Sequence, residues 1–227
     1  MRIGIIVAMG KELDLLLPLI KNKKERTTNN YTIHTGEIGA HQVFAMQCGI
    51  GKVNAAIGTI TIIENFNPEL IINTGVAGGA GLSVRQSDIV VGSDIAYHDV
   101  WCLEEYGQVS GFPLYFHSEE KTVNLLKSIE NKEQIKYGLI CSGDKFISSE
   151  DEINAIRSHF PDVLAVDMES GAIAQVCYMR NVPLLAARVI SDTPGAEKDN
   201  TTQYENFWET APLHTFKILS DILENLN

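Results

Sequence analysis

Short apolar runs alternate with helical segments along most of this chain, and this alternation restricts the possible folds more than any other feature. Strands alternating with helices imply a parallel sheet covered by helices. At 227 residues, one domain is the better expectation than two. We predict a three-layer α/β single domain over residues 1–227, with a mixed, largely parallel central sheet flanked by helices. The expected strands are 2–8, 31–37, 42–48, 70–74, 88–91, 138–142, 163–166 and 183–191. The expected helices are 11–20, 53–65, 121–128, 150–158, 170–180 and 203–225.

The segments between these elements are expected to be irregular. Residues 21–30 are polar and basic, which predicts an exposed loop, whereas 38–41 joins two strands as a hairpin turn. A glycine-rich turn is expected over 75–81. Residues 97–117 have no clear periodicity, which predicts a long loop with a functional role.

Charge and cysteine content argue against several classes of protein. The net charge of −11 is unfavourable for nucleic-acid or anionic-membrane partners, which require basic patches. The four cysteines are widely separated and form no CxxC pair, which is typical of free thiols in a reducing compartment. No apolar stretch reaches the roughly 20 residues of a membrane helix, and no signal-peptide pattern is present. We therefore expect a cytoplasmic protein that binds no metal.

Acidic residues and glycines gather where the predicted strands end, which is where ligands bind in sheets of this kind. The segments are 9–12, 49–52, 75–79, 143–147, 167–169 and 191–192. The glycine-rich stretch can expose backbone N–H groups to a ligand, or it can be a tight turn with close packing. It is neither a dinucleotide fingerprint nor a P-loop, because it lacks the spacing of both.

Five charged residues in these segments are candidates for chemistry, and each has a structural alternative. Arg188 lies in an apolar strand and needs a buried acidic or ligand partner; the alternative is a plain salt bridge. Asp192 lies on the same face of the strand as Arg188 if the strand stays regular to its end; the alternative is that Asp192 caps a turn. The carboxylate of Glu169 can accept hydrogen bonds from both hydroxyls of a ribose. Asp167 and Glu12 also suit the first turn of a helix.

Together these segments resemble the 5′-methylthioadenosine/S-adenosylhomocysteine nucleosidase family, within the purine nucleoside phosphorylase superfamily. Several separate motifs carry the resemblance, in the order in which the family has them. They are Ile3–Met9 with Glu12, Cys48–Val53, Ile71–Gly75 with Ala77–Gly79, Tyr97–Asp99, Ser142–Asp144 with Phe146 and Ile147, Val166–Glu169, and Arg188–Asp192.

The resemblance implies hydrolysis of the N-glycosidic bond of 5′-methylthioadenosine, S-adenosylhomocysteine and related 5′-substituted adenosines, without a cofactor. It implies that Asp192, oriented by Ser191, protonates N7 of the departing adenine. Glu12, helped by Arg188, would activate the attacking water. Such a pair of carboxyl groups is what a reaction with an oxocarbenium-like sugar requires.

The resemblance also assigns residues to substrate binding. Phe146 would stack on the base, and the Ile147 backbone would bond its Watson–Crick edge. Glu169 would bind the ribose hydroxyls, with Met168 against the sugar. The remaining residues implied to line the site are Val76, Ala77 and Gly78 and, around the 5′ substituent, Met9, Ile50 and Tyr204.

Alternatives remain open at this point. Hydrolysis is favoured over a phosphate-dependent reaction, because Glu12 would repel phosphate and Val76 offers it no hydroxyl. A nucleoside-binding protein without catalysis also remains possible. Val76 replaces a serine typical of bacterial members, Asp167 replaces a glutamate, and the loop 99–116 is shorter than usual. The family further implies a homodimer in which the 97–116 loop enters the partner's pocket, and the preferred 5′ substituent is left open.

Overall fold

The computed structural model describes residues 1–128, 135–194, 200–210 and 217–226. Its strands are β1 (Arg2–Val7), β2 (Lys21–Thr28), β3 (Tyr31–Ile38), β4 (His41–Gln47), β5 (Leu70–Gly79), β6 (Ile89–Tyr97), β7 (Phe116–His117), β8 (Ile135–Ser142), β9 (Val163–Asp167) and β10 (Leu184–Asp192). Its helices are α1 (Gly10–Leu16), the short 3₁₀ helix η1 (Leu17–Leu19), α2 (Lys52–Phe66), α3 (Glu120–Ser128), α4 (Glu150–His159), α5 (Ser170–Arg180), α6 (Asn200–Thr210) and α8 (Lys217–Asn225). No helix in these described ranges is long and apolar enough to cross a membrane.

The strands form one mixed sheet in the order β10-β6-β8-β9-β5-β1-β4-β3-β2, with β7 beside β6. β10 also pairs with β5, so five of these strands close into a ring. The central strands β1, β5 and β10 run parallel, which brings their carboxyl ends to the same edge of the sheet.

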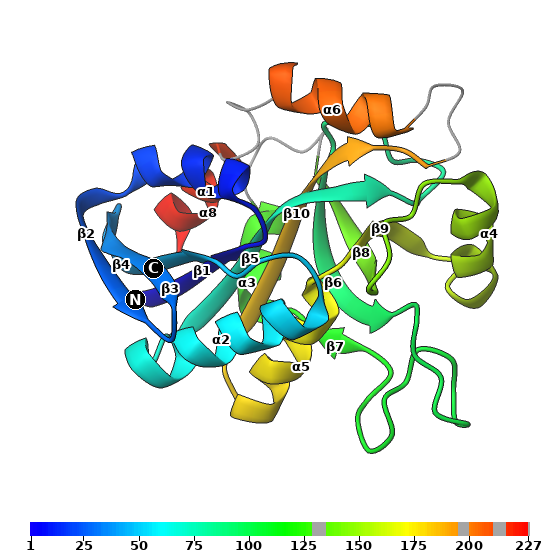
Figure 1. Cartoon of the computed structure of the whole chain (residues 1–227), viewed down its shortest axis with the longest axis horizontal. Helices are drawn as coiled ribbons and strands as arrows, with labels where there is room; N and C mark the ends of the chain where they lie inside the picture. The colour runs from blue at the N-terminus through cyan, green and yellow to red at the C-terminus, as the bar shows by residue number, and fades with distance from the viewer. Residues whose placement is uncertain (129–134, 195–199, 211–216, 227) are drawn as a thin grey trace.

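Helices cover both faces of the sheet (Figure 1). Along β1, Ile3, Ile5 and Val7 pack into a cluster with α1, α3, α6 and α8, whereas Ile6 packs into a second cluster with α2 and α5. This is the period of two expected of a strand buried on both faces. A smaller cluster joins α4 to β8 and β9. The prediction of a mixed three-layer α/β domain is confirmed.

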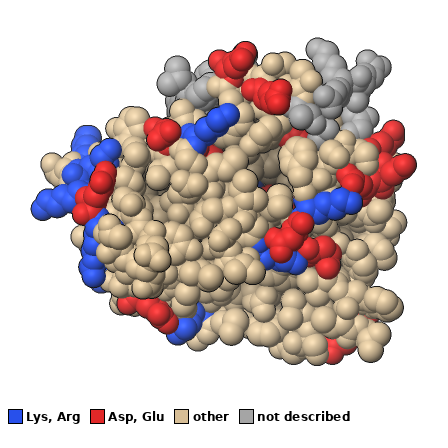
Figure 2. Space-filling view, in the orientation of Figure 1, with Lys and Arg blue, Asp and Glu red and all other residues tan. Residues whose placement is uncertain are grey.

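The prediction of an exposed loop over 21–30 is wrong, because β2 occupies most of this range. β2 pairs antiparallel with β3 and is the last strand of the sheet. Nearly all of its residues are exposed on both faces, so no apolar alternation marks it as a strand. Basic side chains gather over it at the left edge of Figure 2. Charged side chains on an edge strand discourage pairing with other chains.

The predicted turn over 75–81 is also wrong, because β5 continues to Gly79. The helix expected over 11–20 ends at Leu16, and η1 follows with Pro18 in its first turn. Proline has no N–H for the α-helical ladder and disfavours α geometry in the residue before it.

The single C-terminal helix expected over 203–225 is described as two helices, α6 and α8. They lie in different parts of the molecule (Figure 1). Residues 211–216 of the expected helix lie outside the described residues.

Candidate active site

A buried cluster of one arginine and two carboxylates lies where β5, β9 and β10 meet. Arg188 of β10 is fully buried, and its Nε and Nη2 lie 2.8 and 2.7 Å from Oδ2 of Asp167. Its Nη2 also donates to Oδ1 of Asn73 at 2.8 Å and lies 3.6 Å from Oε2 of Glu169. Its Nη1 donates to the carbonyl of Thr74 at 3.1 Å. Asp167 therefore is the direct partner that the sequence demanded for a buried arginine.

Asp167 fulfils the structural alternative as well. Its Oδ1 accepts hydrogen bonds from the N–H groups of Glu169 and Ser170, at 3.3 and 3.2 Å, at the start of α5. Ser170 Oγ donates to the other oxygen of Asp167 and also lies 2.8 Å from Oδ1 of Asn73. One carboxylate thus caps the helix and holds the guanidinium.

Glu12 approaches this cluster from α1, at the end of β1. Its Oε2 accepts the N–H groups of Ala8 and Met9, each at 2.9 Å, which is the contribution that the glutamate makes in a capping box at the start of a helix. Its Oε1 accepts the N–H of Val76 at 2.9 Å. These three bonds fix the carboxylate against the glycine-rich part of β5.

Gly75 provides the space for Glu12. Its φ of +133° is disfavoured for other residues, and a Cβ there would lie 2.3 Å from Oε1 of Glu12 and 3.0 Å from Nη1 of Arg188. The glycine-rich stretch is therefore a strand whose backbone makes room for charged groups, rather than a turn.

Burial shapes the titration of the cluster. It raises the pKa of Glu12 above 4.5, although Arg188 and the three N–H groups oppose the shift. It raises the pKa of Glu169 to about 7, again opposed by Arg188, while Asp167 adds to the increase. Burial alone would lower the pKa of Arg188, but the three carboxylates raise it above its usual value. Carboxyl groups with such raised pKa values are suited to acid–base chemistry near neutral pH.

Asp192 ends β10, next to the same cluster, and is buried. β10 pairs with β5 regularly as far as Ile190 opposite Ala77, and Asp192 then lies opposite Gly78. The strand is therefore irregular at Ser191, so spacing alone does not place Asp192 on the face of Arg188. Ser191 Oγ lies 2.6 Å from Oδ1 of Asp192 and 3.3 Å from the carbonyl of Ala77. A Cβ on Gly78 would lie 3.6 Å from the other oxygen of Asp192.

Tyr204 of α6 connects these carboxylates to the aromatic side of the site. Its hydroxyl donates to Sδ of Met9 at 3.2 Å. Its pKa is raised by burial and by the nearby Glu12, Asp192 and Glu169. Figure 1 shows α6 above the carboxyl end of β10.

The residues implied for base binding lie beside Tyr204 or further out. Phe146 is 46% exposed, and its ring lies edge-on to that of Tyr204 with 5.9 Å between centroids. Ile147 is buried against α4, Met168 is half-buried, and Ile50 is 53% exposed. The site is therefore closed around the carboxylates and open towards Phe146 and Ile50.

Asn73 and Ser170 take part in the cluster but were not among the predicted site residues. Asn73 offered a signal, because it is a polar residue that follows the apolar run 70–72 in a buried strand. Ser170 offered none, since serine is common at the start of a helix.

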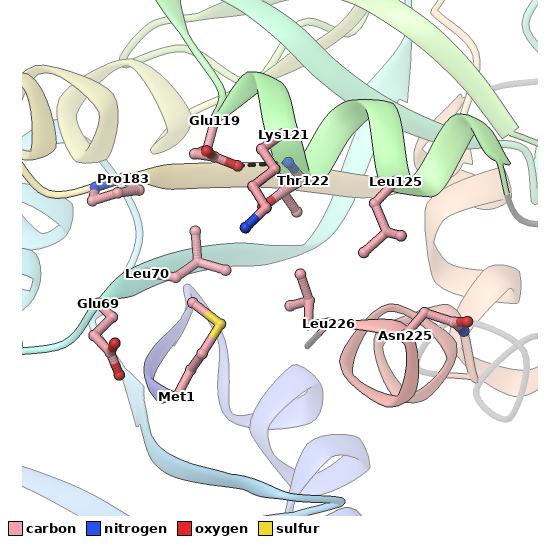
Figure 3. Close-up of a pocket in the computed structure, with 10 residues that line it drawn as sticks. All are labelled: Met1, Glu69, Leu70, Glu119, Lys121, Thr122, Leu125, Pro183, Asn225 and Leu226. Carbon is pink, nitrogen blue, oxygen red and sulfur yellow. Dashed lines mark hydrogen bonds between the residues drawn. The ribbon is translucent and has the colours of Figure 1, made fainter.

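A separate cavity of about 420 Å³ lies at the opposite edge of the sheet, beside Met1, Leu70 and Pro183, at the starts of β1, β5 and β10 (Figure 3). Leu125 and Leu226 form much of its apolar wall, and Lys121 lies at its upper rim. None of the carboxylates described above lines it.

Comparisons with known proteins identify the family of the chain. The family model described as the phosphorylase superfamily matches residues 2–224. The 5′-methylthioadenosine/S-adenosylhomocysteine nucleosidase of Haemophilus influenzae (strain PittEE) is 39% identical over the whole of both chains. The enzyme of that name from Anoxybacillus flavithermus is 36% identical, also over the whole of both chains.

Solved structures agree as well. The nucleosidase from S. pneumoniae with the transition-state inhibitor MT-ImmA superimposes with a TM-score of 0.94 at 37% identity, over the full length of both chains. S-adenosylhomocysteine nucleosidase from Streptococcus pyogenes, in complex with 5-methylthiotubericidin, gives a TM-score of 0.95 at 36% identity. The superposition covers 100% of this chain and 98% of that structure's chain. The chain belongs to the phosphorylase superfamily and, within it, to the 5′-methylthioadenosine/S-adenosylhomocysteine nucleosidase family.

Proposed function

We propose that this protein hydrolyses the N-glycosidic bond of 5′-methylthioadenosine, S-adenosylhomocysteine and related 5′-substituted adenosines, and releases adenine. The observation that carries the proposal is the position of Glu12. Its buried carboxylate is held by the Val76 N–H beside Arg188, where a phosphate nucleophile would meet a like charge. Water, by contrast, can be bound and deprotonated there, which favours hydrolysis over phosphorolysis.

The leaving group and the sugar need different residues. Adenine leaves slowly as an anion, so Asp192, held by Ser191, donates a proton to N7 as the bond lengthens. Glu169 accepts the ribose hydroxyls, and Met168 lies against the sugar. Phe146 stacks on the base.

The rest of the site completes the pocket. The Ile147 backbone bonds the edge of the base, and Ala77 and Gly78 line the floor of the site. Met9, Ile50 and Tyr204 surround the 5′ substituent. The hydrogen bond between Tyr204 and Met9 supports their placement in one part of the pocket. We propose that residues 1–227 form one such domain, because one sheet joins β1 to β10 and the described residues of α6 and α8 pack into the cluster on one of its faces.

Adenine release in phosphate-free buffer tests the function. Asp192→Asn and Glu12→Gln are each expected to lower kcat by about 10²–10⁴-fold, the usual contribution of a positioned acid or base. Glu64→Gln is the matched control, because Glu64 pairs with Arg180 at 3.0 Å on the surface, away from the site. Adenine release that requires phosphate and forms ribose 1-phosphate would establish a phosphorylase instead. Binding of the nucleoside without turnover over hours would establish a binding protein.

A homodimer is the proposed assembly, with the 97–116 loop reaching the partner's pocket. Large apolar side chains are exposed on α2, on α5 and in the loop, among them Val53, Met179, Trp101 and Leu103, which are 59–86% exposed. Figure 2 shows a broad face over α2 and α5 with charges mainly at its rim. Apolar patches of this kind mark interfaces. Elution at twice the 25.0 kDa chain mass at micromolar concentration is expected, and elution as a single chain would refute the dimer.

The proposed location is the cytoplasm. All four cysteines are free, and Cys48, Cys141 and Cys177 are buried. Free thiols are typical of reducing compartments. Recovery of the native protein from a periplasmic rather than a cytoplasmic fraction would overturn this assignment.

A further inference from the structure

We propose that Lys52, Asp99 and Asp144 form a clamp that positions the base-binding and ribose-binding groups of the site. Lys52 begins α2, Asp99 follows β6, and Asp144 follows β8, so the clamp joins three separate segments. None of the three belongs to the carboxylate cluster. The inference rests on the proposed function for its activity readout and on adenine binding for an independent one.

The clamp is a closed set of charge-assisted hydrogen bonds. Nζ of Lys52 lies 2.9 and 2.8 Å from the two oxygens of Asp99. Oδ2 of Asp99 also accepts the backbone N–H of Asp144 at 2.8 Å. Oδ1 of Asp144 accepts the backbone N–H of Lys52 at 2.7 Å. Each carboxylate therefore fixes the backbone of another segment, and not only a mobile side chain.

The backbone positions that the clamp fixes lead directly to the site. Gly51 precedes Lys52, and its N–H donates to Oε1 of Glu169 at 2.9 Å. Gly51 has a φ of +92°, and a Cβ there would lie 3.0 Å from Oδ1 of Asp144. Asp144 itself precedes Phe146 by two residues. The clamp thus holds the group that orients Glu169 and the segment that carries the base-stacking ring.

Packing beneath the clamp limits how far these segments can move. His98 is buried, and a Cβ on Gly143 would lie 2.5 Å from its Cε1. Lys52 also lies over the ring of Tyr97, 5.4 Å from its centroid. The side chains of Lys52 and Asp99 are only 25% and 26% exposed, so solvent screens this pair less than a surface pair. Rigid support of this kind is what precise substrate positioning requires.

Lys52→Met and Asp99→Asn test the clamp, with Lys52→Arg as the conservative variant. We expect each of the first two to raise KM for 5′-methylthioadenosine and the inhibition constant of adenine by roughly 5- to 30-fold. Lys52→Arg should recover part of both. Loss of folded protein alone would lower the apparent kcat and leave KM and adenine inhibition unchanged. Glu64→Gln is the matched control. Glu64 lies on α2, as Lys52 does, and its exposed ion pair with Arg180 of α5 is at a distance from the clamp.

The pH profile gives a second readout. The Gly51 N–H lowers the pKa of Glu169, which burial raises to about 7, so a displaced Gly51 should move the acidic limb of kcat/KM to higher pH. The other charged or titratable groups that act on Glu169 are unchanged in these variants. They are Arg188, Asp167, Glu12, Cys48 and Tyr204.

The proposal is overturned if KM, adenine inhibition and the acidic limb all stay within twofold of the wild type in Lys52→Met and Asp99→Asn. Where either variant does not fold, Lys52→Gln keeps a polar donor on a shorter stem and is judged by the same limit. If the wild type releases no adenine, the proposed function fails, and adenine affinity by calorimetry then decides the clamp alone.

Discussion

Replacing Glu169 by glutamine should stabilise the folded protein at alkaline pH, although it removes a proposed ribose ligand. Burial, opposed in part by Arg188, raises the pKa of Glu169 from 4.5 to about 7. A carboxyl group with a higher pKa in the folded state binds its proton more tightly there, so its ionisation destabilises the fold. The stability that the proton provides is fully present below pH 4.5 and is lost as the pH rises through about 7.

The displacement of this pKa sets the size of the effect. One pKa unit corresponds to about 1.4 kcal/mol, so complete ionisation of Glu169 costs the folded state about 3 kcal/mol. At pH 5, about 1 kcal/mol of this cost is present, because the unfolded chain is already largely ionised there. At pH 8.5 nearly all of it is present. The free energy of unfolding of Glu169→Gln, relative to the wild type, should therefore rise by roughly 2–3 kcal/mol between these two pH values.

Urea unfolding of both proteins at pH 5 and pH 8.5, at one fixed protein concentration, measures this change. Groups that do not face Glu169 are common to both proteins and cancel in the difference. Glu12 faces Glu169 and loses a neighbouring negative charge in the variant, so its contribution has the same sign as the predicted change. Glu64→Gln should show no comparable change, because its ion pair is exposed. An advantage of Glu169→Gln that is equal at both pH values, or larger at pH 5, would refute the argument from burial.

Three further substitutions follow from the geometry. Gly75→Ala should lower kcat at least about 100-fold, because the new Cβ would displace the carboxylate of Glu12. It should also destabilise the protein by about 2–4 kcal/mol, because residue 75 has a positive φ that alanine disfavours. Steady-state kinetics measure the first effect and urea unfolding the second. Ser149→Ala removes the side chain that caps α4, so it should cost about 1 kcal/mol in urea unfolding and leave kcat unchanged. Tyr204→Phe removes the hydrogen bond to Met9, worth about 1 kcal/mol, so KM for 5′-methylthioadenosine should rise about fivefold with kcat within twofold. A KM in Tyr204→Phe equal to that of the wild type would contradict the placement of Tyr204, and so of α6, at the 5′ end of the pocket.

The buried strands were predictable from the sequence, because burial on both faces leaves continuous apolar runs such as those of β1 and β10. β2 was not, because its stability comes from backbone pairing with β3 while its side chains remain in solvent. Pattern analysis detects where side chains are buried, not where backbone N–H groups are paired.

The sequence indicated which residues belong to the site better than it indicated which of them contact one another. The need of Arg188 for a carboxylate followed from its apolar surroundings, but Glu169 and Glu12 were as eligible as Asp167. Only the parallel register of β10 against β5, and the course of β9 to Asp167, decide the choice. The irregularity at Ser191 is equally invisible in the sequence, because it depends on pairing between strands far apart in the chain.

The cost of ionising Glu169 and the proposed chemistry have the same origin. Within the described ranges, Arg188 is the one cation that acts on both Glu169 and Glu12, and it also pairs with Asp167. Each of its three nitrogens already donates to an oxygen of the protein. The cluster thus has an excess of negative charge that burial makes unfavourable. A sugar that becomes oxocarbenium-like brings positive charge to this place as the glycosidic bond breaks, whereas the ground-state nucleoside does not. The electrostatic energy that destabilises the free protein is therefore relieved most in the transition state, which is the condition for acceleration rather than tight substrate binding. Phosphate would add to the negative charge, so in the proposed reaction the same excess that lowers stability also favours water as the nucleophile.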